Sequence, residues 1–165
     1  MAEPVPMHPN TQRVIAAATD AGLRIEVQRF PAGTRTAADA ARAVGCDVAQ
    51  IVKSLVFVAG GDPVVALVSG ADRVDPRKLA AALDASHARR ADGDEAQAAT
   101  GYAIGGVPPF GHRAALTVLV DDRLRRHATV WAAAGLPDAV FAITPDDLVR
   151  ASGGRIADLA EAPED

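Results

Sequence analysis

Residues 51–70, "IVKSLVFVAGGDPVVALVSG", predict a β-hairpin. Two runs rich in β-branched residues are separated by Gly60-Gly61-Asp62, a combination typical of a tight turn between antiparallel strands. In the first run, alternating residues point to opposite faces, and both faces carry apolar side chains. This pattern predicts a strand that is covered on two sides. We therefore expect an antiparallel pair of strands at the centre of the fold.

Length and composition limit the class of protein. A chain of 165 residues has the size of one ordinary domain, and we expect a single domain over residues 1–165. The net charge of −4 argues against a general nucleic-acid coat, and DNA is not an expected partner. Cys46 is the only cysteine, which excludes an internal disulfide framework and fits a reducing compartment. Since no apolar run approaches about eighteen residues and the start lacks a secretory pattern, we expect a soluble cytoplasmic protein without membrane contact.

Helix and strand signals alternate irregularly around the hairpin. Apolar spacing and caps predict helices over residues 10–22, 36–45, 75–84, 92–101 and 144–154, the first of them capped by Asn10 or Thr11. Strands are predicted over residues 23–30, 115–121, 128–134 and 139–144, with a turn or short helix over 122–127. A mixture of this kind, with a hairpin at its centre, indicates the α+β class rather than a regular series of β-α-β units.

Lys53 is an unusual residue for this hairpin, because it is charged. It is one of only two lysines, against fifteen arginines, and it interrupts an otherwise apolar strand. Because an unpaired ammonium in a dry core is too costly to keep, Lys53 either reaches a sheet edge, where it discourages aggregation, or lies in a cavity that holds an anion. The neighbouring Ser54 faces the opposite side of the strand, so a Ser-Lys nucleophile pair is geometrically poor.

A second unusual stretch is the loop "TGYAIGGVPPFGHR", residues 100–113. His112 and Arg113 stand where a phosphate-binding loop requires Lys and Ser or Thr, which excludes a nucleoside-triphosphate loop. Gly105 and Gly106 permit close approach of a ligand to the backbone, while the Pro108-Pro109 pair stiffens the loop. A stiff loop with exposed amides can polarise an ester carbonyl, although the alternative of an ordinary helix-to-strand connection stays open.

Three stretches together carry a family resemblance: "QIVKSLVF" (50–57), "ATGYAIGGVPPFGH" (99–112) and "LTVLVDD" (116–122). Their order and spacing resemble the YbaK/EbsC/ProX family of aminoacyl-tRNA deacylases, relatives of the editing domain of prolyl-tRNA synthetases. The resemblance implies a compact α+β domain with a mixed, mainly antiparallel sheet that forms an irregular barrel-like core with flanking helices. It also implies hydrolysis of the ester bond of mischarged tRNA, without a cofactor or a metal. The expected partners are the aminoacyl-tRNA 3′ end and an aminoacyl-tRNA synthetase.

The same resemblance assigns residues to the site. The family lysine falls on Lys53 and the G-x-x-x-P loop on Gly105 to Pro109, so Lys53, Gly105, Gly106 and Pro109 are the expected catalytic residues. Lys53 would bind a phosphate or a ribose hydroxyl, and the loop amides would hold the ester carbonyl. The expected substrate-binding residues are Phe30, Ser54, Tyr102, Val107, Pro108, Phe110, Gly111, His112 and Asp121. Phe30 has core packing as an alternative role, and His112 and Asp121 have capping.

Three functions stay open from the sequence. The first is trans-editing deacylation of tRNA(Pro), or a similar tRNA, that carries a small amino acid. The second is a tRNA- or synthetase-binding module without turnover, and the third is hydrolysis of a small acyl ester. Five arginines discriminate between them, because a single approach lined by basic residues favours tRNA, whereas scattered residues favour the small ester. These are Arg89, Arg90, Arg123, Arg125 and Arg126.

Overall fold

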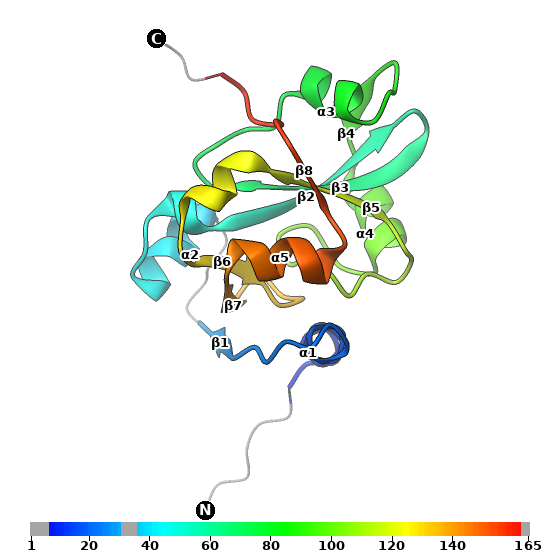
Figure 1. The fold of residues 1–165 in the computed structure, drawn as a ribbon. Helices are drawn as coiled ribbons and strands as arrows, with labels where there is room; N and C mark the ends of the chain where they lie inside the picture. Colours follow the sequence, from blue (N-terminus) through cyan, green and yellow to red (C-terminus); the bar gives the residue numbers. More distant parts are fainter. Residues whose placement is uncertain (1–6, 31–35, 163–165) are drawn as a thin grey trace, which may run out of the picture.

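The computed structural model describes residues 7–30 and 36–162, which form two sheets and their flanking helices (Figure 1). A five-stranded sheet has the order β4-β2-β3-β5-β8, and a three-stranded sheet has the order β1-β7-β6. The strands of the larger sheet are β2 (Val52–Ala59), β3 (Asp62–Ser69), β4 (Ala88–Arg90), β5 (Thr117–Asp121) and β8 (Arg155–Ala157). Those of the smaller sheet are β1 (Val27–Arg29), β6 (Val130–Ala133) and β7 (Ala139–Ile143).

The predicted hairpin is confirmed as the centre of the larger sheet. β2 and β3 pair antiparallel along their full length, and the turn residues Gly60 and Gly61 have φ angles of 58° and 89°, a conformation that favours glycine. β2 also pairs antiparallel with β4, while β3 and β5, and β5 and β8, pair parallel. The α+β class and the mixed, mainly antiparallel pairing are therefore confirmed.

The barrel-like core takes the form of two separate sheets rather than a closed barrel. Within the described ranges, the strands of the two sheets are joined by a single parallel bridge, Ile51 to Trp131. Closing a barrel would require a continuous hydrogen-bond ladder around the core, and β2 and β6 share no such ladder.

The helices are α1 (Pro9–Asp20), α2 (Ala37–Val44), α3 (Pro76–Ala82), α4 (Gly93–Thr100) and α5 (Pro145–Ser152). Thr36, Asp75 and Thr144 cap α2, α3 and α5, as their sequences predict, and Asp92 caps α4. The predicted cap of α1 is wrong. The helix begins earlier, because Pro9 suits the first helical position and His8 accepts a hydrogen bond from the Asn10 amide at 3.1 Å. In the part of the chain that the structure describes, no helix is long and apolar enough to cross a membrane.

Several strand predictions need correction. Only Val27–Arg29 of the predicted strand over 23–30 pairs with a neighbour, because β7 offers partners to just these residues. Leu23 and Ile25 pack on the core without joining the sheet. β4 and β8 have three residues each and were not predicted, since so short a segment carries no readable alternation. The segments Val48–Gln50 and Asp122–Arg126 are 3-10 helices, the second at the predicted turn or short helix.

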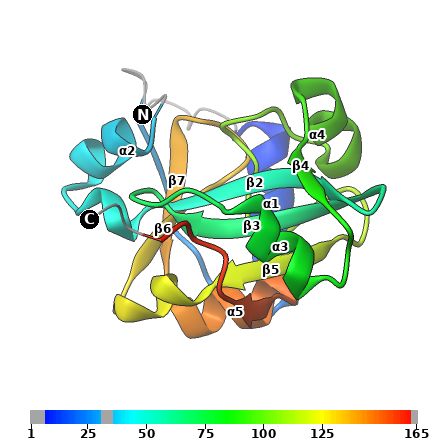
Figure 2. The same cartoon turned by 90° about the horizontal axis from the view of Figure 1, so that it is seen from above.

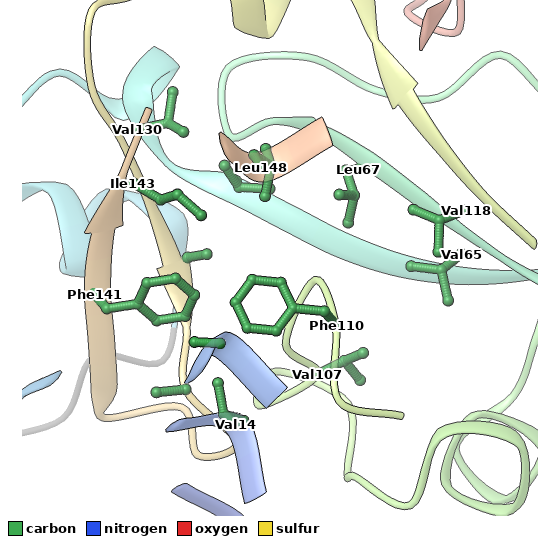
Figure 3. Close-up of a cluster of buried hydrophobic side chains, with 14 of the residues drawn as sticks. Val14, Val65, Leu67, Val107, Phe110, Val118, Val130, Phe141, Ile143 and Leu148 are labelled. Carbon is green, nitrogen blue, oxygen red and sulfur yellow. The ribbon is translucent and has the colours of Figure 1, made fainter. Parts of the chain in front are cut away.

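Hydrophobic side chains fill both sides of the larger sheet. α3 covers one side, and α1, α5 and the smaller sheet lie on the other (Figure 1). In the larger cluster Val65 and Leu67 of β3 meet residues of α1, α5, β6 and β7 (Figure 3). Phe110, from the loop after α4, stacks against Phe141 with ring centroids 5.7 Å apart. This packing fixes the glycine- and proline-rich loop beside the sheets.

Candidate functional site

A cavity of about 280 Å³ lies where the two sheets diverge, beside the edge of β2. Figure 2 shows α2 and α4 toward opposite ends of β2, and both helices contribute to the walls. The lining residues are Thr36, Ala37, Ala40, Ile51, Val52, Lys53, Ser54, Leu55, Val56, Arg90, Ala91, Ala96, Ile104, Gly105, Val107, Trp131, Ala132, Ala133, Pro137 and Val140.

Small side chains create this space. Six of the lining residues are alanines, contributed by α2, the β4–α4 segment and β6: Ala37, Ala40, Ala91, Ala96, Ala132 and Ala133. The remaining walls are mainly aliphatic, so the interior suits a small, largely apolar group. The polar side chains that reach the cavity are those of Thr36, Lys53, Ser54 and Arg90.

Lys53 lies at this cavity, half-buried. Its ammonium donates a hydrogen bond to the backbone oxygen of Asp72, and the Asp72 carboxylate accepts one from Arg123 at 2.9 Å. Burial lowers the pKa of Lys53; the Asp72 carboxylate opposes that shift, and the cations Arg90 and Arg73 add to it. The sequence left open a sheet edge or an anion-holding cavity for Lys53, and the structure places Lys53 at a cavity that borders the edge of β2.

Arg90 is the only one of the five candidate arginines that lines the cavity. It is exposed, and its guanidinium lies 5.8 Å from the centroid of the Phe57 ring. Its neighbour Arg89 instead forms an ion pair with Glu95 at 2.7 Å, and that hydrogen bond holds the pKa of Glu95 at about 2. Lys53 and Arg90 thus provide a local positive charge in a chain whose net charge is −4.

The other three arginines lie on the 3-10 helix after β5. Arg123 is bound to Asp72, and Arg125 forms an ion pair with Asp122. Arg123 therefore reaches the neighbourhood of Lys53 through a shared partner, whereas Arg125 and Arg126 do not line the cavity. The five arginines are scattered rather than gathered along one approach, an arrangement that favours a small acyl ester over tRNA as the substrate.

Ser54 lines the cavity, but its hydroxyl is closed off from it. The Oγ is buried, and no hydrogen-bond partner for it exists among the residues that the structure describes. Leaving a buried hydroxyl unpaired costs roughly 1–3 kcal/mol of folding free energy.

The glycine- and proline-rich loop reaches the cavity through Ile104, Gly105 and Val107. Gly105 has a φ of +91°, which favours glycine, and Gly106 packs so closely that a Cβ atom would lie 3.0 Å from the Gly135 oxygen. The Gly106 amide donates to Ala103 at 3.0 Å. For the amides of Gly105 and Val107, no acceptor is found within residues 7–30 and 36–162, and both residues line the cavity.

The rest of this loop is held by internal contacts and does not line the cavity. The His112 ring Nε2 lies 2.8 Å from the Pro108 oxygen, and Tyr102 donates its hydroxyl to Gly111 at 2.7 Å. Burial lowers the pKa of His112, and the hydrogen bond with the Pro108 oxygen opposes that shift. Pro109 is buried, and Phe110 belongs to the core.

Two further predicted residues also lie away from the cavity walls. Phe30 follows β1, where its amide donates to Asp138 at 2.8 Å. Asp121 is only 1% exposed, and its carboxylate accepts from the amides of Arg123, Leu159 and Ala160, so it ties β5 to the C-terminal segment. Trp131 and the alanine walls were not predicted; the single tryptophan beside three alanines was the available signal.

Comparisons with known proteins identify a matching family model and a similar solved structure. Residues 31–151 match the family model described as "Aminoacyl-tRNA editing domain". Among solved structures, one described as a "putative trans-editing enzyme for prolyl tRNA synthetase" superposes with a TM-score of 0.89 and 42% identity over 95% of this chain and 100% of that one.

Two curated relatives are similar to this chain over part of its length. It is 36% identical over 107 residues to the proline–tRNA ligase of Acidithiobacillus ferrooxidans, a match that spans 65% of this chain and 19% of the ligase. It is 25% identical over 125 residues to the "Putative Cys-tRNA(Pro)/Cys-tRNA(Cys) deacylase EbsC" of Enterococcus faecalis, covering 75% of this chain and 76% of that protein.

Proposed function

Because the chain belongs to the aminoacyl-tRNA editing domain family, we propose that it is a trans-editing deacylase that hydrolyses the ester of mischarged tRNA. The observation that carries this proposal is the cavity that joins Lys53, Arg90 and the amides of the loop around a small apolar space. Such a cavity suits an ester with a small acyl group on one side and a nucleotide phosphate on the other. The family model matches residues 31–151 as one span, which supports a single editing domain.

Lys53 and Arg90 bind the nucleotide in this proposal. The Lys53 ammonium uses one N–H on the Asp72 oxygen, and the other two remain for a phosphate or a ribose hydroxyl of the 3′ end. Arg90 is exposed at the same cavity and binds backbone phosphate. Together they orient the terminal nucleotide so that its ester lies inside.

Hydrolysis needs a water, a polarised carbonyl and a proton for the leaving oxygen. The amides of Gly105 and Val107 stabilise the oxyanion that forms when water attacks the carbonyl carbon. The bond between that carbon and the ribose oxygen then breaks, and the ribose oxygen takes the proton that the water gives up. The neighbouring ribose hydroxyl assists this transfer, so no side-chain nucleophile is required. Gly106 and Pro109 hold the loop in shape from behind the cavity.

The expected substrate is a tRNA that carries a small amino acid. The cavity of about 280 Å³ with its alanine walls has space for a short side chain. Synthetases cannot reject such residues by binding alone, because one methylene changes the binding free energy by only about 1–3 kcal/mol. The likeness to proline–tRNA ligase and to a trans-editing enzyme for that synthetase supports tRNA(Pro) as the carrier and prolyl-tRNA synthetase as a partner.

The test is a deacylation panel with purified protein. It contains Ala, Cys and Ser on tRNA(Pro), Ser on tRNA(Thr), correctly charged Pro-tRNA(Pro), and alanine methyl ester as a small ester. We expect release of one or a few small amino acids from tRNA, with Pro-tRNA(Pro) and the methyl ester left intact. Binding of tRNA without release of any amino acid would replace the proposal with a binding module, and cleavage of the methyl ester alone would replace it with a small-ester hydrolase.

A further inference from the structure

Beside the cavity, part of the β2 edge is left uncovered by the strands that the structure describes. β4 pairs with β2 at Phe57, Val58 and Ala59, and the next contact along this edge is the bridge from Ile51 to Trp131. Between them, no described strand covers Ser54, and Ser54 lines the cavity. The sheet therefore has a gap at Ser54, bounded by Ile51 on one side and by Val56, which accepts a hydrogen bond from Ala91, on the other.

The backbone of Ser54 points into this gap. The Ala91 amide donates to the Val56 oxygen at 3.0 Å, so the polar groups of Val56 face the β4 side. Because the N–H and C=O of alternate residues in a strand face the same edge, those of Ser54 face this side too.

The pairing with β3 agrees with this orientation. The Gly70 amide donates to the Ile51 oxygen at 2.7 Å, so Ile51 and, by alternation, Lys53 and Leu55 use their polar groups on β3. The register also places Pro63, which has no N–H, opposite Val58, at one of the pairs that make no hydrogen bonds across the hairpin.

We infer that Ser54 recognises the aminoacyl group as a strand one residue long. In an extended amino acid, the amine and the carbonyl oxygen face the same side, as they do in a strand residue. The amine of the substrate would donate to the Ser54 oxygen, and its ester carbonyl would accept from the Ser54 amide. This is the exchange between two directly opposed residues of an antiparallel pair, whose Cα atoms lie about 5.5 Å apart. The inference rests on the proposed function for the identity of the ligand.

The enclosure of the gap selects this ligand over a peptide. An added peptide strand needs a run of open edge, whereas here β4 and Trp131 close the edge on either side of Ser54. A single amino acid fits the gap, and the cavity of about 280 Å³ has room for it.

The pairing also places the amino-acid side chain. Directly opposed residues project their side chains to the same face, so an L-amino acid would direct its side chain to the face of Ser54 and Val56. Val56 packs there with Ala96, which leaves space for a short group. A turn of the Ser54 side chain about its Cα–Cβ bond would bring the unpartnered hydroxyl to that group.

Two uncleavable ligands test the inference on the full chain. They are 3′-(L-alanylamino)-3′-deoxyadenosine and the matched 3′-propionylamino compound, which lacks only the amine. We expect the alanyl compound to bind at least roughly tenfold more tightly in calorimetry, the size of one hydrogen bond to a charged group. Saturation with it should slow hydrogen exchange at the Ser54 amide, while the amides of Lys53 and Leu55, already bonded to β3, should change little.

Each result separates the inference from the deacylase proposal. Equal affinities, or an unprotected Ser54 amide in a protein that hydrolyses mischarged tRNA, would overturn the inference and leave the activity intact. Amine-dependent binding with Ser54 protection, in a protein that hydrolyses no ester, would support the inference and overturn the proposed activity. If neither compound binds and no ester is cleaved, both are wrong.

Discussion

Lys53 donates a hydrogen bond from its ammonium to the backbone oxygen of Asp72. The acceptor is neutral, and the carboxylate of the same residue is bound to Arg123 at 2.9 Å. Among the described residues, the Lys53 ammonium is therefore held in place without an ion pair to a carboxylate. A fixed, half-buried cation of this kind is suited to an anionic ligand.

Gly105 and Gly61 form a matched pair for testing the loop. Their φ angles are +91° and +89°, and a Cβ atom at either position meets no contact closer than 3.7 Å. Gly105→Ala and Gly61→Ala should each cost roughly 1–2 kcal/mol of unfolding free energy, measured by urea denaturation, because L-residues are strained at positive φ. Only Gly105→Ala should slow deacylation, by about tenfold, since Gly61 lies in the distant hairpin turn. Equal rates for the two variants would remove Gly105 from the site.

Arg90 and Arg89 are neighbours with different surroundings. Arg90 lines the cavity, whereas Arg89 is bound to Glu95. We expect Arg90→Ala to weaken tRNA binding and to reduce the slope of log affinity against log salt by about 0.7–0.9, the value for one lost phosphate contact. Arg89→Ala should change neither quantity appreciably. A reduced slope in Arg89→Ala but not in Arg90→Ala would place the tRNA backbone elsewhere.

His112 should make stability depend on pH. Burial lowers the pKa of His112 in the folded state, so the unfolded chain binds more protons between that value and about 6.5, the ordinary pKa of histidine. Stability should therefore fall as the pH is lowered through this window and should be fully present above it. Urea midpoints measured at pH 5 and pH 8 should differ more for wild type than for His112→Gln. The same difference in both proteins would assign the pH dependence to other groups.

Ser54 and Ser69 allow a test of the unpartnered hydroxyl. Ser69 donates to the Ala49 oxygen at 2.8 Å and accepts from the Ala71 amide at 3.2 Å, whereas the Ser54 hydroxyl has no partner in the described residues. Thermal and urea unfolding should show a loss of about 1–2 kcal/mol in Ser69→Ala and no loss in Ser54→Ala. A loss in Ser54→Ala as large as that in Ser69→Ala would mean that the hydroxyl is already satisfied.

The parts of the fold that sequence predicts well are those with local causes. The hairpin follows from its glycine turn and apolar runs, and the caps at Thr36, Asp75 and Thr144 form within a few residues of each helix start. β4 was missed because Ala88–Arg90 is short and polar, and it becomes a strand only by pairing with β2.

In the site, too, features with local causes could be predicted, and features that depend on distant residues could not. Lys53 could be singled out because a charge within an apolar strand demands a partner. The cavity could not be outlined, since its walls come from alanines on separate elements whose small size matters only after they meet. The gap at Ser54 likewise depends on where β4 ends and where Trp131 touches β2, which are properties of the sheet and not of residues 50–57.

The most direct measurement of the central claim is single-turnover deacylation of mischarged tRNA by wild type, Lys53→Ala and Lys78→Ala. These are the two lysines of the chain, and Lys78 binds Asp158 and the Ala160 oxygen without lining the cavity. We predict that Lys53→Ala slows release of the amino acid roughly 10- to 100-fold, as expected for loss of a charge-assisted hydrogen bond, while Lys78→Ala retains the wild-type rate. Equal rates in wild type and Lys53→Ala, or no release by wild type from any small aminoacyl-tRNA, would contradict the account.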